Sequence, residues 1–316
     1  MSRLPTVVCI VGPTACHKTE TAVQLARRVG GEIVSADSVS VYRGLDVGSA
    51  KPTVEERSGV PHHMIDVADI DETDFTVARF REEARAAIDG ILSRNNLPIV
   101  VGGSGLYSDA IFSDMRFSAP SDPAIRRELE EDYAKDANAV FARLRSVDPV
   151  TADRLHPNDA KRVIRALEVY CVSGKPYSAW NDDFCKVQEA SCGYTVLRYG
   201  LTMDRNALYA RINARVDRMF ARGLQEEAYA LFQRGYTPDR HPAMQAIGYS
   251  QLYDAYLQRC TVDEAREAIK LATRHFAKRQ LTWFRRNPQT VWFSFDEYDS
   301  ADSLVNALEQ EIRNQW

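Results

Sequence analysis

The stretch Pro5-Thr-Val-Val-Cys-Ile-Val-Gly-Pro-Thr-Ala-Cys-His-Lys-Thr19 decides the fold of this chain. Its apolar run from Val7 to Val11 predicts a buried parallel strand. A tight loop follows this run, and the alanine-rich sequence from Thr19 to Val29 predicts a helix directly after the loop. A strand, a tight loop and a helix in this order are the context of a phosphate-binding loop.

The loop holds the groups that such a site needs. Backbone N–H groups of the loop and of the helix start point at an anion, and the helix dipole adds to the attraction. Lys18 is placed to reach the terminal phosphates, and the hydroxyl of Thr19 is placed to ligate a magnesium ion. The alternative is an ordinary strand–turn–helix with a lone lysine. The predicted phosphate-binding segment comprises Gly12, Pro13, Thr14, Ala15, Cys16, His17, Lys18 and Thr19.

His17 departs from the loop pattern, which has glycine just before the lysine. Glycine at this position lets the backbone approach the phosphates and adopt conformations that are closed to residues with a Cβ. A histidine must therefore bear backbone strain or move the loop.

The amino-acid composition limits the classes of protein to which this chain can belong. The 316 residues are enough for a sizeable core and one or two domains, and an apolar content of 45% fits a soluble globular protein. No apolar run approaches the roughly 18–20 residues of a membrane span, and the N-terminus carries no visible secretory signal. The six cysteines show no paired CxxC spacing, so we expect a reduced, cytoplasmic protein without a zinc site. The net charge of −4 gives no global sign of nucleic-acid binding, so any indication of such binding must come from local clusters of basic residues.

A carboxylate ends the second predicted strand, which runs from Glu32 to Asp37. Ligands of open parallel sheets bind beyond the carboxyl ends of the strands, so Asp37 is expected on the same edge as the first loop. A carboxylate beside bound pyrophosphate is either a magnesium partner or a general base. The alternative is an aspartate that caps a helix or stabilises a turn.

Two more strands are predicted, over residues 62–67 and 98–101, with a helix over residues 75–94 between them. The second of these strands runs into the glycine-rich turn 102–107. That turn would place Ser104 and nearby backbone amides on the same edge of the sheet as the first loop.

Residues 121–180 are charged and helical in pattern, and strand signals return only near Tyr194. We therefore expect a helical insertion, over about residues 113–195, within an α/β domain. Its third helix begins near Asp159 and carries Lys161, Arg162 and Arg165 in its first turns. Cations at a helix N-terminus oppose the helix dipole, so this placement favours a ligand-facing role over a solvated face.

The helix predicted after Asp204 carries two stripes, one apolar and one of arginines, rotated by about 100° from each other. Four arginines beside a buried face suit a polyanion such as pyrophosphate or an RNA backbone. The alternative is a solvated face whose arginines pair with Asp217, Glu226 and Glu227. The arginines are Arg211, Arg215, Arg218 and Arg222.

The last long helix, from about Val262 to Trp283, is basic in an otherwise acidic chain. Aromatic residues, among them Phe276 and Phe284, are interleaved with its lysines and arginines. This combination looks like an RNA-contact surface, although some of the aromatic residues belong to the core.

These segments together resemble the tRNA dimethylallyltransferases, the family of bacterial tRNA isopentenyltransferases, over roughly residues 7–293. The first motifs that carry the resemblance are Gly12-Pro-Thr-Ala with Lys18-Thr19, Asp37-Ser38, Tyr42-Arg-Gly-Leu-Asp-Val-Gly48, Pro61-His-His-Met-Ile-Asp66 and Val101-Gly-Gly-Ser-Gly-Leu-Tyr107. The later ones are His156-Pro-Asn-Asp159, Lys161-Arg-Val-Ile-Arg165, Arg211-Ile-Asn-Ala-Arg215, Gln245-Ala-Ile-Gly-Tyr249 and Thr273-Arg-His-Phe-Ala-Lys-Arg-Gln-Leu-Thr-Trp-Phe284.

The resemblance implies an α/β fold with a P-loop kinase-like parallel sheet, flanked by helices, and an inserted all-helical domain. The core would comprise residues 1–112 and 196–316, and residues 113–195 would contact the anticodon arm of tRNA. The implied reaction transfers a dimethylallyl group from dimethylallyl diphosphate to the exocyclic amine of the adenine 3′ of the anticodon. The implied partners are tRNA and dimethylallyl diphosphate, with Mg²⁺ as cofactor, no membrane and a monomeric enzyme.

The resemblance also implies roles for single residues. Asp37 matches the general base, Arg215 a diphosphate-side arginine and Arg162 another essential arginine, while Lys18 and Thr19 with magnesium would hold the diphosphate rather than a nucleoside triphosphate. The adenine must leave the anticodon stack to reach the site. The matching tRNA-contact regions are Asp37, Ser38, Val39 and Ser40; Ser104; Lys161, Arg162, Val163, Ile164 and Arg165; and Gln245, Ala246, Ile247, Gly248, Tyr249 and Ser250.

The chain departs from the family pattern at His17, at Ser40, where a glutamine is common, and mildly at Ser104, where threonine is usual. Ala160 and Ser250 also differ from common family residues. Other functions compatible with the sequence are a P-loop kinase, a prenyltransferase for free adenine nucleotides, and a tRNA-binding homologue whose loop His17 has disabled.

Overall fold

The computed structural model describes residues 4–72, 75–113, 121–180 and 192–315. The chain forms two compact units. The first comprises Met1–Ser113 with Gln188–Trp316, and the second comprises Asp114–Val187. The change in sequence pattern predicted an insertion over about residues 113–195.

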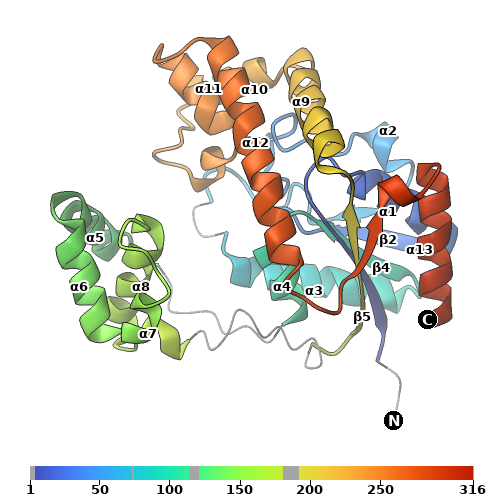
Figure 1. Ribbon diagram of the computed structural model, residues 1–316, viewed down its shortest axis with the longest axis horizontal. Helices are drawn as coiled ribbons and strands as arrows, with labels where there is room; N and C mark the ends of the chain where they lie inside the picture. The colour runs from blue at the N-terminus through green and yellow to red at the C-terminus, as the bar shows by residue number, and fades with distance from the viewer. Residues whose placement is uncertain (1–3, 73–74, 114–120, 181–191, 316) are drawn as a thin grey trace. The chain divides into compact units, whose positions relative to one another are not determined.

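The first unit is built on a six-stranded sheet in which every pair of neighbouring strands is parallel. The strand order is β3-β2-β4-β1-β5-β6 (Figure 1). The apolar run at the N-terminus lies in the middle, where Val8 faces Ile99 on one side and Leu197 on the other. The bounds are β1 Thr6–Val11, β2 Gly31–Ser35, β3 His62–His63, β4 Leu97–Gly102, β5 Thr195–Thr202 and β6 Val291–Ser294.

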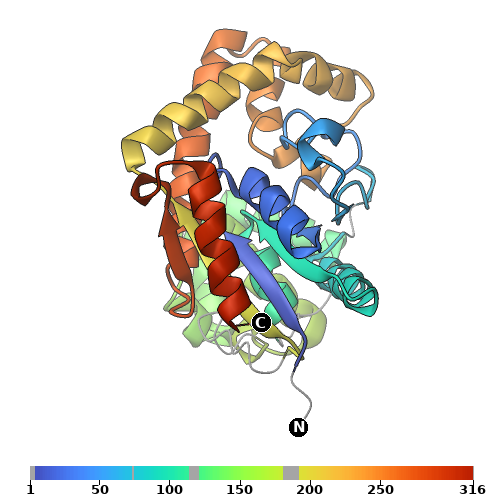
Figure 2. The same ribbon diagram turned by 90° about the vertical axis from the view of Figure 1, so that its right-hand side faces the viewer.

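Helices cover both faces of the sheet, as the alternation of side chains along β1 shows. Val8 and Ile10 pack into a cluster with α1 (Lys18–Val29) and α13 (Ala301–Gln315). Val7, Cys9 and Val11 point the other way, toward α3 (Val77–Ser93) and α4 (Gly105–Phe112). Figure 2 shows α13 beside α1 on the near side of the sheet. Because both faces are covered, every residue of β1 is buried.

Four helices form a further group beyond the carboxyl ends of the strands (Figure 1). They are α9 (Arg205–Ala221), α10 (Leu224–Gln233), α11 (Tyr249–Tyr256) and α12 (Val262–Phe284). Aspartate and threonine side chains cap α9 and α12, since Asp204 and Thr261 accept hydrogen bonds from backbone N–H groups of the first turn. The short elements of this unit are α2 (Val54–Arg57), η3 (Pro242–Gln245) and η4 (Phe295–Glu297).

The third strand is much shorter than the sequence predicted. Extended structure was expected over residues 62–67, but β3 ends at His63. Met64 and Asp66 both have positive φ angles, 63° and 57°, which a strand cannot accommodate. The other predicted strands and helices begin and end within a few residues of the observed ones.

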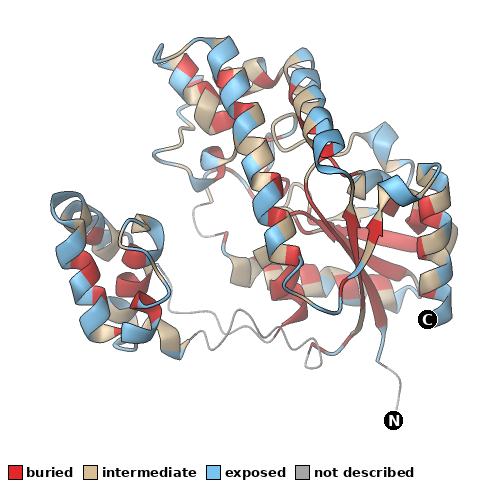
Figure 3. Cartoon of the chain, viewed as in Figure 1, coloured by how far each residue is buried: buried red, intermediate tan, exposed pale blue. Residues whose placement is uncertain are grey.

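The second unit is a small helical bundle. Its helices are α5 (Pro123–Lys135), α6 (Ala137–Val147), α7 (Pro149–Ala152) and α8 (Ala160–Ser173), followed by η1 (Tyr177–Ala179). Figure 3 shows their buried residues turned toward one another, and the core contains Leu129, Leu144, Val163 and Leu167. An aspartate caps the N-terminus of each of the four α-helices: Asp122, Asp136, Asp148 and Asp159.

In neither unit does a helix combine the length and the apolar character needed to span a membrane, within the residues described.

Candidate active site

The loop after β1 has the tight backbone that a phosphate-binding loop requires. Gly12 has φ +148°, and a Cβ on it would lie 2.4 Å from the carbonyl oxygen of Leu201. Ala15 and His17 both adopt left-handed conformations, with φ 64° and 57°. Such a conformation costs a non-glycine residue roughly 1–2 kcal/mol. Histidine therefore bears the backbone strain that its place in the pattern predicted.

The carbonyl oxygen of Pro13 holds two side chains inside the loop. It accepts hydrogen bonds from Lys18 Nζ at 2.6 Å and from Cys16 Sγ at 2.9 Å. Burial raises the pKa of the Cys16 thiol, so Cys16 is a packing residue and not a thiolate nucleophile. Burial lowers the pKa of Lys18, because the charged ammonium loses its hydration.

Two cavities open on the loop, with volumes of about 410 Å³ and about 660 Å³. Lys18, Thr19 and Arg215 line both of them. The first cavity also contains Asp37, and it reaches α12 at Thr273, Phe276, Arg279 and Gln280. The second is lined by the rest of the loop, from Ala15 to His17, and by the arginines of α9.

Arg215 is half-buried on α9 between the two cavities. Burial lowers the pKa of its guanidinium, while the charge of Asp37 raises it. No hydrogen bond or ion pair links Arg215 to any residue that the structure describes. Two cations, those of Lys18 and Arg215, thus share a partly desolvated position where a bound anion would stabilise both.

The arginine stripe of α9 faces the second cavity. Arg211, Arg215, Arg218 and Arg222 all line it. Two of the acids that could have paired with the stripe have other partners. Asp217 forms an ion pair with Lys270 at 2.8 Å, and Glu227 accepts hydrogen bonds from the backbone of the loop at residues 46–48. The arginines of the stripe therefore line a cavity, and Asp217 and Glu227 are engaged with other partners instead of pairing with them.

Asp37 follows β2 on the wall of the first cavity. Its Oδ1 accepts hydrogen bonds from the backbone N–H of Val39 at 2.8 Å and of Ser40 at 3.1 Å, so the predicted turn aspartate is also a cavity residue. Within the described chain, no donor contacts its other oxygen, Oδ2. The carboxylate is thus held in place by its own turn through Oδ1.

Ser38 and Ser104 join two loops at this edge of the sheet. The hydroxyl of Ser104 accepts a hydrogen bond from the backbone N–H of Ser38 at 3.1 Å and donates one to the Ser38 hydroxyl at 3.2 Å. The glycine-rich turn after β4 therefore lies beside the Asp37 turn, as the parallel sheet predicted.

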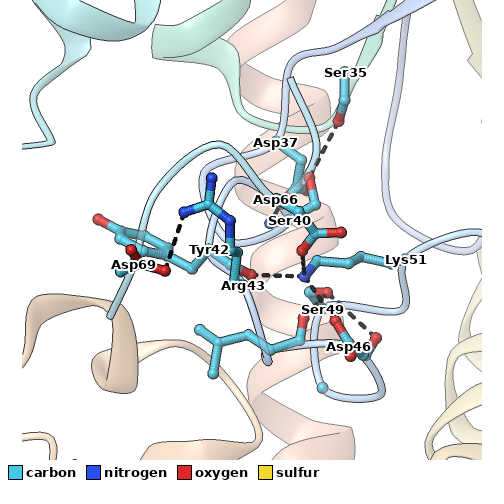
Figure 4. Close-up of polar contacts among 12 residues, drawn as sticks. Ser35, Asp37, Ser40, Tyr42, Arg43, Asp46, Ser49, Lys51, Asp66 and Asp69 are labelled. Carbon is cyan, nitrogen blue, oxygen red and sulfur yellow. Dashed lines mark hydrogen bonds and ion pairs between the residues drawn. The ribbon is translucent and has the colours of Figure 1, made fainter. Parts of the chain in front are cut away.

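Lys51 lines both cavities, but its ammonium group has other partners (Figure 4). It donates to Asp46 at 2.7 Å, to Asp66 at 2.5 Å and to the carbonyl oxygen of Tyr42 at 2.6 Å. These contacts fix the loop that walls the cavities. Lys51 is therefore a structural residue of the site.

Gln280 lies within the family motif from Thr273 to Phe284, but the sequence alone assigned it no role in the site. Its side-chain amide accepts a hydrogen bond from the backbone N–H of Thr14 at 2.8 Å and donates one to the carbonyl oxygen of Gly103 at 2.8 Å. It thus ties the first loop to the glycine-rich turn. One signal was available, since Gln280 shares the buried face of α12 with Ala277 and Phe284. A polar side chain is costly to bury unless it forms hydrogen bonds, so its position in an apolar stripe indicates specific partners.

The segment from Gln245 to Ser250 is only partly exposed to the first cavity. Gln245, Ala246 and Ile247 line it. Gly248 is the N-cap residue of α11. The Tyr249 side chain is buried, and its hydroxyl donates a hydrogen bond to Glu227 at 2.7 Å. Ser250 donates its hydroxyl hydrogen to the carbonyl oxygen of Ala246 at 3.3 Å.

The predicted contact residues on α8 belong to the second unit. Val163 and Ile164 are buried in its core, so their side chains do not reach the surface. Lys161 and Arg162 are exposed, with Arg162 3.5 Å from Asp159. Arg165 is 2.8 Å from the buried Glu168, which it helps to neutralise.

The residues present fit a magnesium ion held largely by phosphate. Thr19 is exposed to both cavities, and Asp37 shares the first with it, so the nearby donors are oxygens. Among the described residues, no cluster of three His, Cys, Asp or Glu side chains could hold a metal ion. The described residues alone offer too few ligands, and a bound diphosphate would supply the others.

The chain is similar in sequence to known proteins over most of its length. The model of a family described as IPP transferase matches residues 40–287. A protein named tRNA dimethylallyltransferase from Pelotomaculum thermopropionicum is 45% identical over 303 residues, which cover 96% of this chain and 95% of the relative.

Two solved structures are also similar. The tRNA isopentenylpyrophosphate transferase of Bacillus halodurans has 40% identity and a TM-score of 0.72, with 99% of this chain and 96% of that one covered. A eukaryotic dimethylallyltransferase described as acting on tRNA has 26% identity and a TM-score of 0.78, with 98% and 80% covered.

Proposed function

The chain belongs to the IPP transferase family, and we propose that the residues lining its two cavities catalyse the transfer of a dimethylallyl group to tRNA. The donor is dimethylallyl diphosphate, and the acceptor is the exocyclic amine of the adenine 3′ of the anticodon. Diphosphate is the leaving group. The chain is thus a tRNA-modifying prenyltransferase.

One observation carries this proposal. Lys18 and Arg215, two cations without a bound carboxylate partner among the described residues, share a cavity with Asp37. An anion-binding end and a candidate base therefore lie in a single space of about 410 Å³. That arrangement suits a reaction in which a nucleophile loses a proton while a diphosphate departs.

The chemistry follows from these positions. The adenine nitrogen attacks the first carbon of the dimethylallyl group, so a C–N bond forms while the C–O bond to the diphosphate breaks. The electron pair of the broken bond leaves with the diphosphate, where Lys18 and Arg215 stabilise the added charge. Asp37 accepts the proton from the attacking amine through Oδ2, while its turn holds Oδ1.

Magnesium is part of the proposal. Thr19 would hold it together with diphosphate oxygens, and the bound ion would neutralise charge on the leaving group. The rest of the loop, from Gly12 to Lys18, would bind the diphosphate through its backbone N–H groups.

tRNA is the proposed macromolecular substrate, and the adenine would have to leave its stack to enter the first cavity. The proposed contacts are Asp37 to Ser40 and Gln245 to Ile247, which line that cavity, and Ser104, which is hydrogen-bonded to Ser38 beside it. The exposed cations Lys161 and Arg162 of the second unit would contact the phosphates of the anticodon arm.

We further propose that the enzyme acts as a monomer in the cytoplasm. The described cysteines, Cys9, Cys16, Cys171, Cys192 and Cys260, are free thiols, as expected in a reducing compartment.

A transfer assay tests the function. Radiolabelled dimethylallyl diphosphate and magnesium are incubated with unmodified tRNA or, in parallel, with AMP. We expect label in tRNA only, and a loss of about 10²–10⁴-fold in the Asp37→Asn variant, because a general base contributes that much. Asp69→Asn is the matched control, since Asp69 is an exposed partner of Arg43 outside both cavities.

The other outcomes are equally informative. Label in AMP would indicate a nucleotide prenyltransferase. Transfer of the γ-phosphate of labelled ATP would indicate a kinase. Binding of tRNA without any transfer, in a folded protein, would indicate a homologue that His17 has disabled.

A further inference from the structure

The His17 side chain is held on two sides. Its Nδ1 lies 2.8 Å from Oε2 of Glu20, in the first turn of α1. Its ring packs on Phe295 of η4, with ring centroids 4.8 Å apart and an interplanar angle of 38°. His17 and Phe295 are far apart in the sequence, and they meet because β6 returns to the edge of the sheet beside β5.

The other left-handed residue of the loop is held from α9. Arg211 donates from Nε to the carbonyl oxygen of Ala15 at 3.0 Å, and its terminal nitrogen lies 3.4 Å from His17 Nδ1. Each non-glycine residue with positive φ in the loop therefore contacts an element from a distant part of the chain.

Phe295 does not itself belong to the binding site. It is absent from the linings of the two cavities described above, whereas His17 lines the second one. Any effect of Phe295 on a bound diphosphate must therefore act through His17.

We propose that Phe295 is a positioning residue for diphosphate binding. A glycine would adopt the left-handed conformation before Lys18 without help. A histidine needs its ring supported on one side, and Phe295 supplies that support, so the loop N–H groups stay directed at the anion. The proposal rests on the proposed function of the loop as the diphosphate site.

The competing explanation is ordinary packing, since Phe295 also lies against the apolar cluster of α1 and α13. The two explanations differ in one respect. If Phe295 acts through the His17 ring, its removal matters only while that ring is present. If it merely fills space, its removal has the same effect with glycine at position 17.

A double-mutant cycle tests this. Phe295→Ala, His17→Gly and the double variant are compared with the wild type in the dissociation constant of dimethylallyl diphosphate with magnesium, measured by calorimetry. We expect Phe295→Ala to raise this constant about three- to tenfold in the wild-type background, the range for loss of an aromatic pair. In the His17→Gly background we expect a change of less than about twofold.

Steady-state kinetics supplies a second readout. The KM for the donor should rise in Phe295→Ala, while kcat and the KM for tRNA stay unchanged, because only donor binding is affected. Phe295→Tyr keeps the aromatic ring, so its KM for the donor should stay at the wild-type value. Tyr298→Ala is the matched control, because Tyr298 packs against the same cluster and stacks on Phe293 rather than on His17.

An equal effect of Phe295→Ala in both backgrounds would overturn the proposal, as would a lowered melting temperature without any change in donor binding. If Phe295→Ala does not fold, Phe295→Leu replaces it in the cycle. Failure of the cycle is distinct from failure of the proposed function, because wild-type transfer to tRNA is measured in the same experiment.

Discussion

The buried hydroxyl of Tyr249 donates a hydrogen bond to the carboxylate of Glu227 at 2.7 Å. The same carboxylate accepts from the backbone N–H groups of Asp46, Val47 and Gly48 at 2.8–3.0 Å. Glu227 of α10 thus joins α11 to the loop at residues 46–48, which contributes to the walls of both cavities. Burial and the Glu227 charge raise the pKa of Tyr249, so it remains a proton donor at every working pH.

Tyr249→Phe removes one hydrogen bond from this carboxylate without changing the packing of the ring. We expect a loss of about 1–3 kcal/mol in the free energy of unfolding, because the half-buried carboxylate of Glu227 loses a hydrogen-bond donor. Urea denaturation measures this. Tyr253→Phe is the control, since Tyr253 makes ring contacts with Phe232 and Tyr256, and its loss of a hydroxyl should be nearly neutral. Equal effects of the two substitutions would contradict the role of Glu227.

Arg215→Met should separate binding from stability. Affinity for dimethylallyl diphosphate should fall about 10- to 100-fold, since a hydrogen bond to a charged group contributes about 1.5–3 kcal/mol. The ligand-free protein should be as stable as the wild type or more so, because the burial that lowers the pKa of Arg215 destabilises its charged form. Calorimetry and thermal melting measure the two quantities.

Arg205→Met is the control for that substitution, because Arg205 lies at the start of the same helix, is exposed and lines neither cavity. A clear loss of stability in Arg215→Met would show that Arg215 is mainly a structural residue.

Gln280→Leu should weaken the tie between the two loops. It leaves the N–H of Thr14 and the carbonyl oxygen of Gly103 without their partner, at a cost of about 1–3 kcal/mol for each buried group. We expect lower stability and a higher KM for the donor, measured by denaturation and by transfer kinetics. Gln289→Leu, at an exposed position, should change neither. An unchanged donor KM in Gln280→Leu would mean that the amide serves stability alone.

Glu32 should give the protein a defined acid sensitivity. Hydrogen bonds from Arg94 are the main reason why the pKa of Glu32 is lowered from 4.5 to about 2. Burial raises this pKa, whereas further hydrogen bonds from Asn96 and His63 lower it. A carboxyl with a lowered pKa stabilises the fold above its unfolded pKa and loses that contribution as the pH falls through the folded pKa. The stabilisation is therefore complete above about pH 4.5 and disappears toward pH 2.

Arg94→Met tests that pH dependence. The difference in unfolding free energy between wild type and variant should be largest near neutral pH and should vanish as the pH approaches 2. A difference that stays constant across this range would show that Arg94 acts through packing rather than through the charge of Glu32.

Local sequence patterns predicted the central strands well, since β1 and β4 are continuous buried runs, the first followed by a tight loop and the second by a glycine-rich turn. The family resemblance drawn from separated motifs is confirmed by the IPP transferase match and by the similar curated proteins and structures. The pattern failed at β3, where the left-handed residues Met64 and Asp66 end a strand that the apolar sequence would have extended. Nothing in composition distinguishes such residues from strand residues.

The sequence by itself determined the parallel sheet, the tight loop after its first strand and the family, because each depends on residues close together in the chain or on motifs in a fixed order. Only the tertiary structure decided what holds the site in place. Gln280 meets Thr14 across 266 residues, and Phe295 supports His17 from the opposite end of the chain. Such contacts leave no local periodicity, because they form only when the sheet brings the ends of distant strands to one edge.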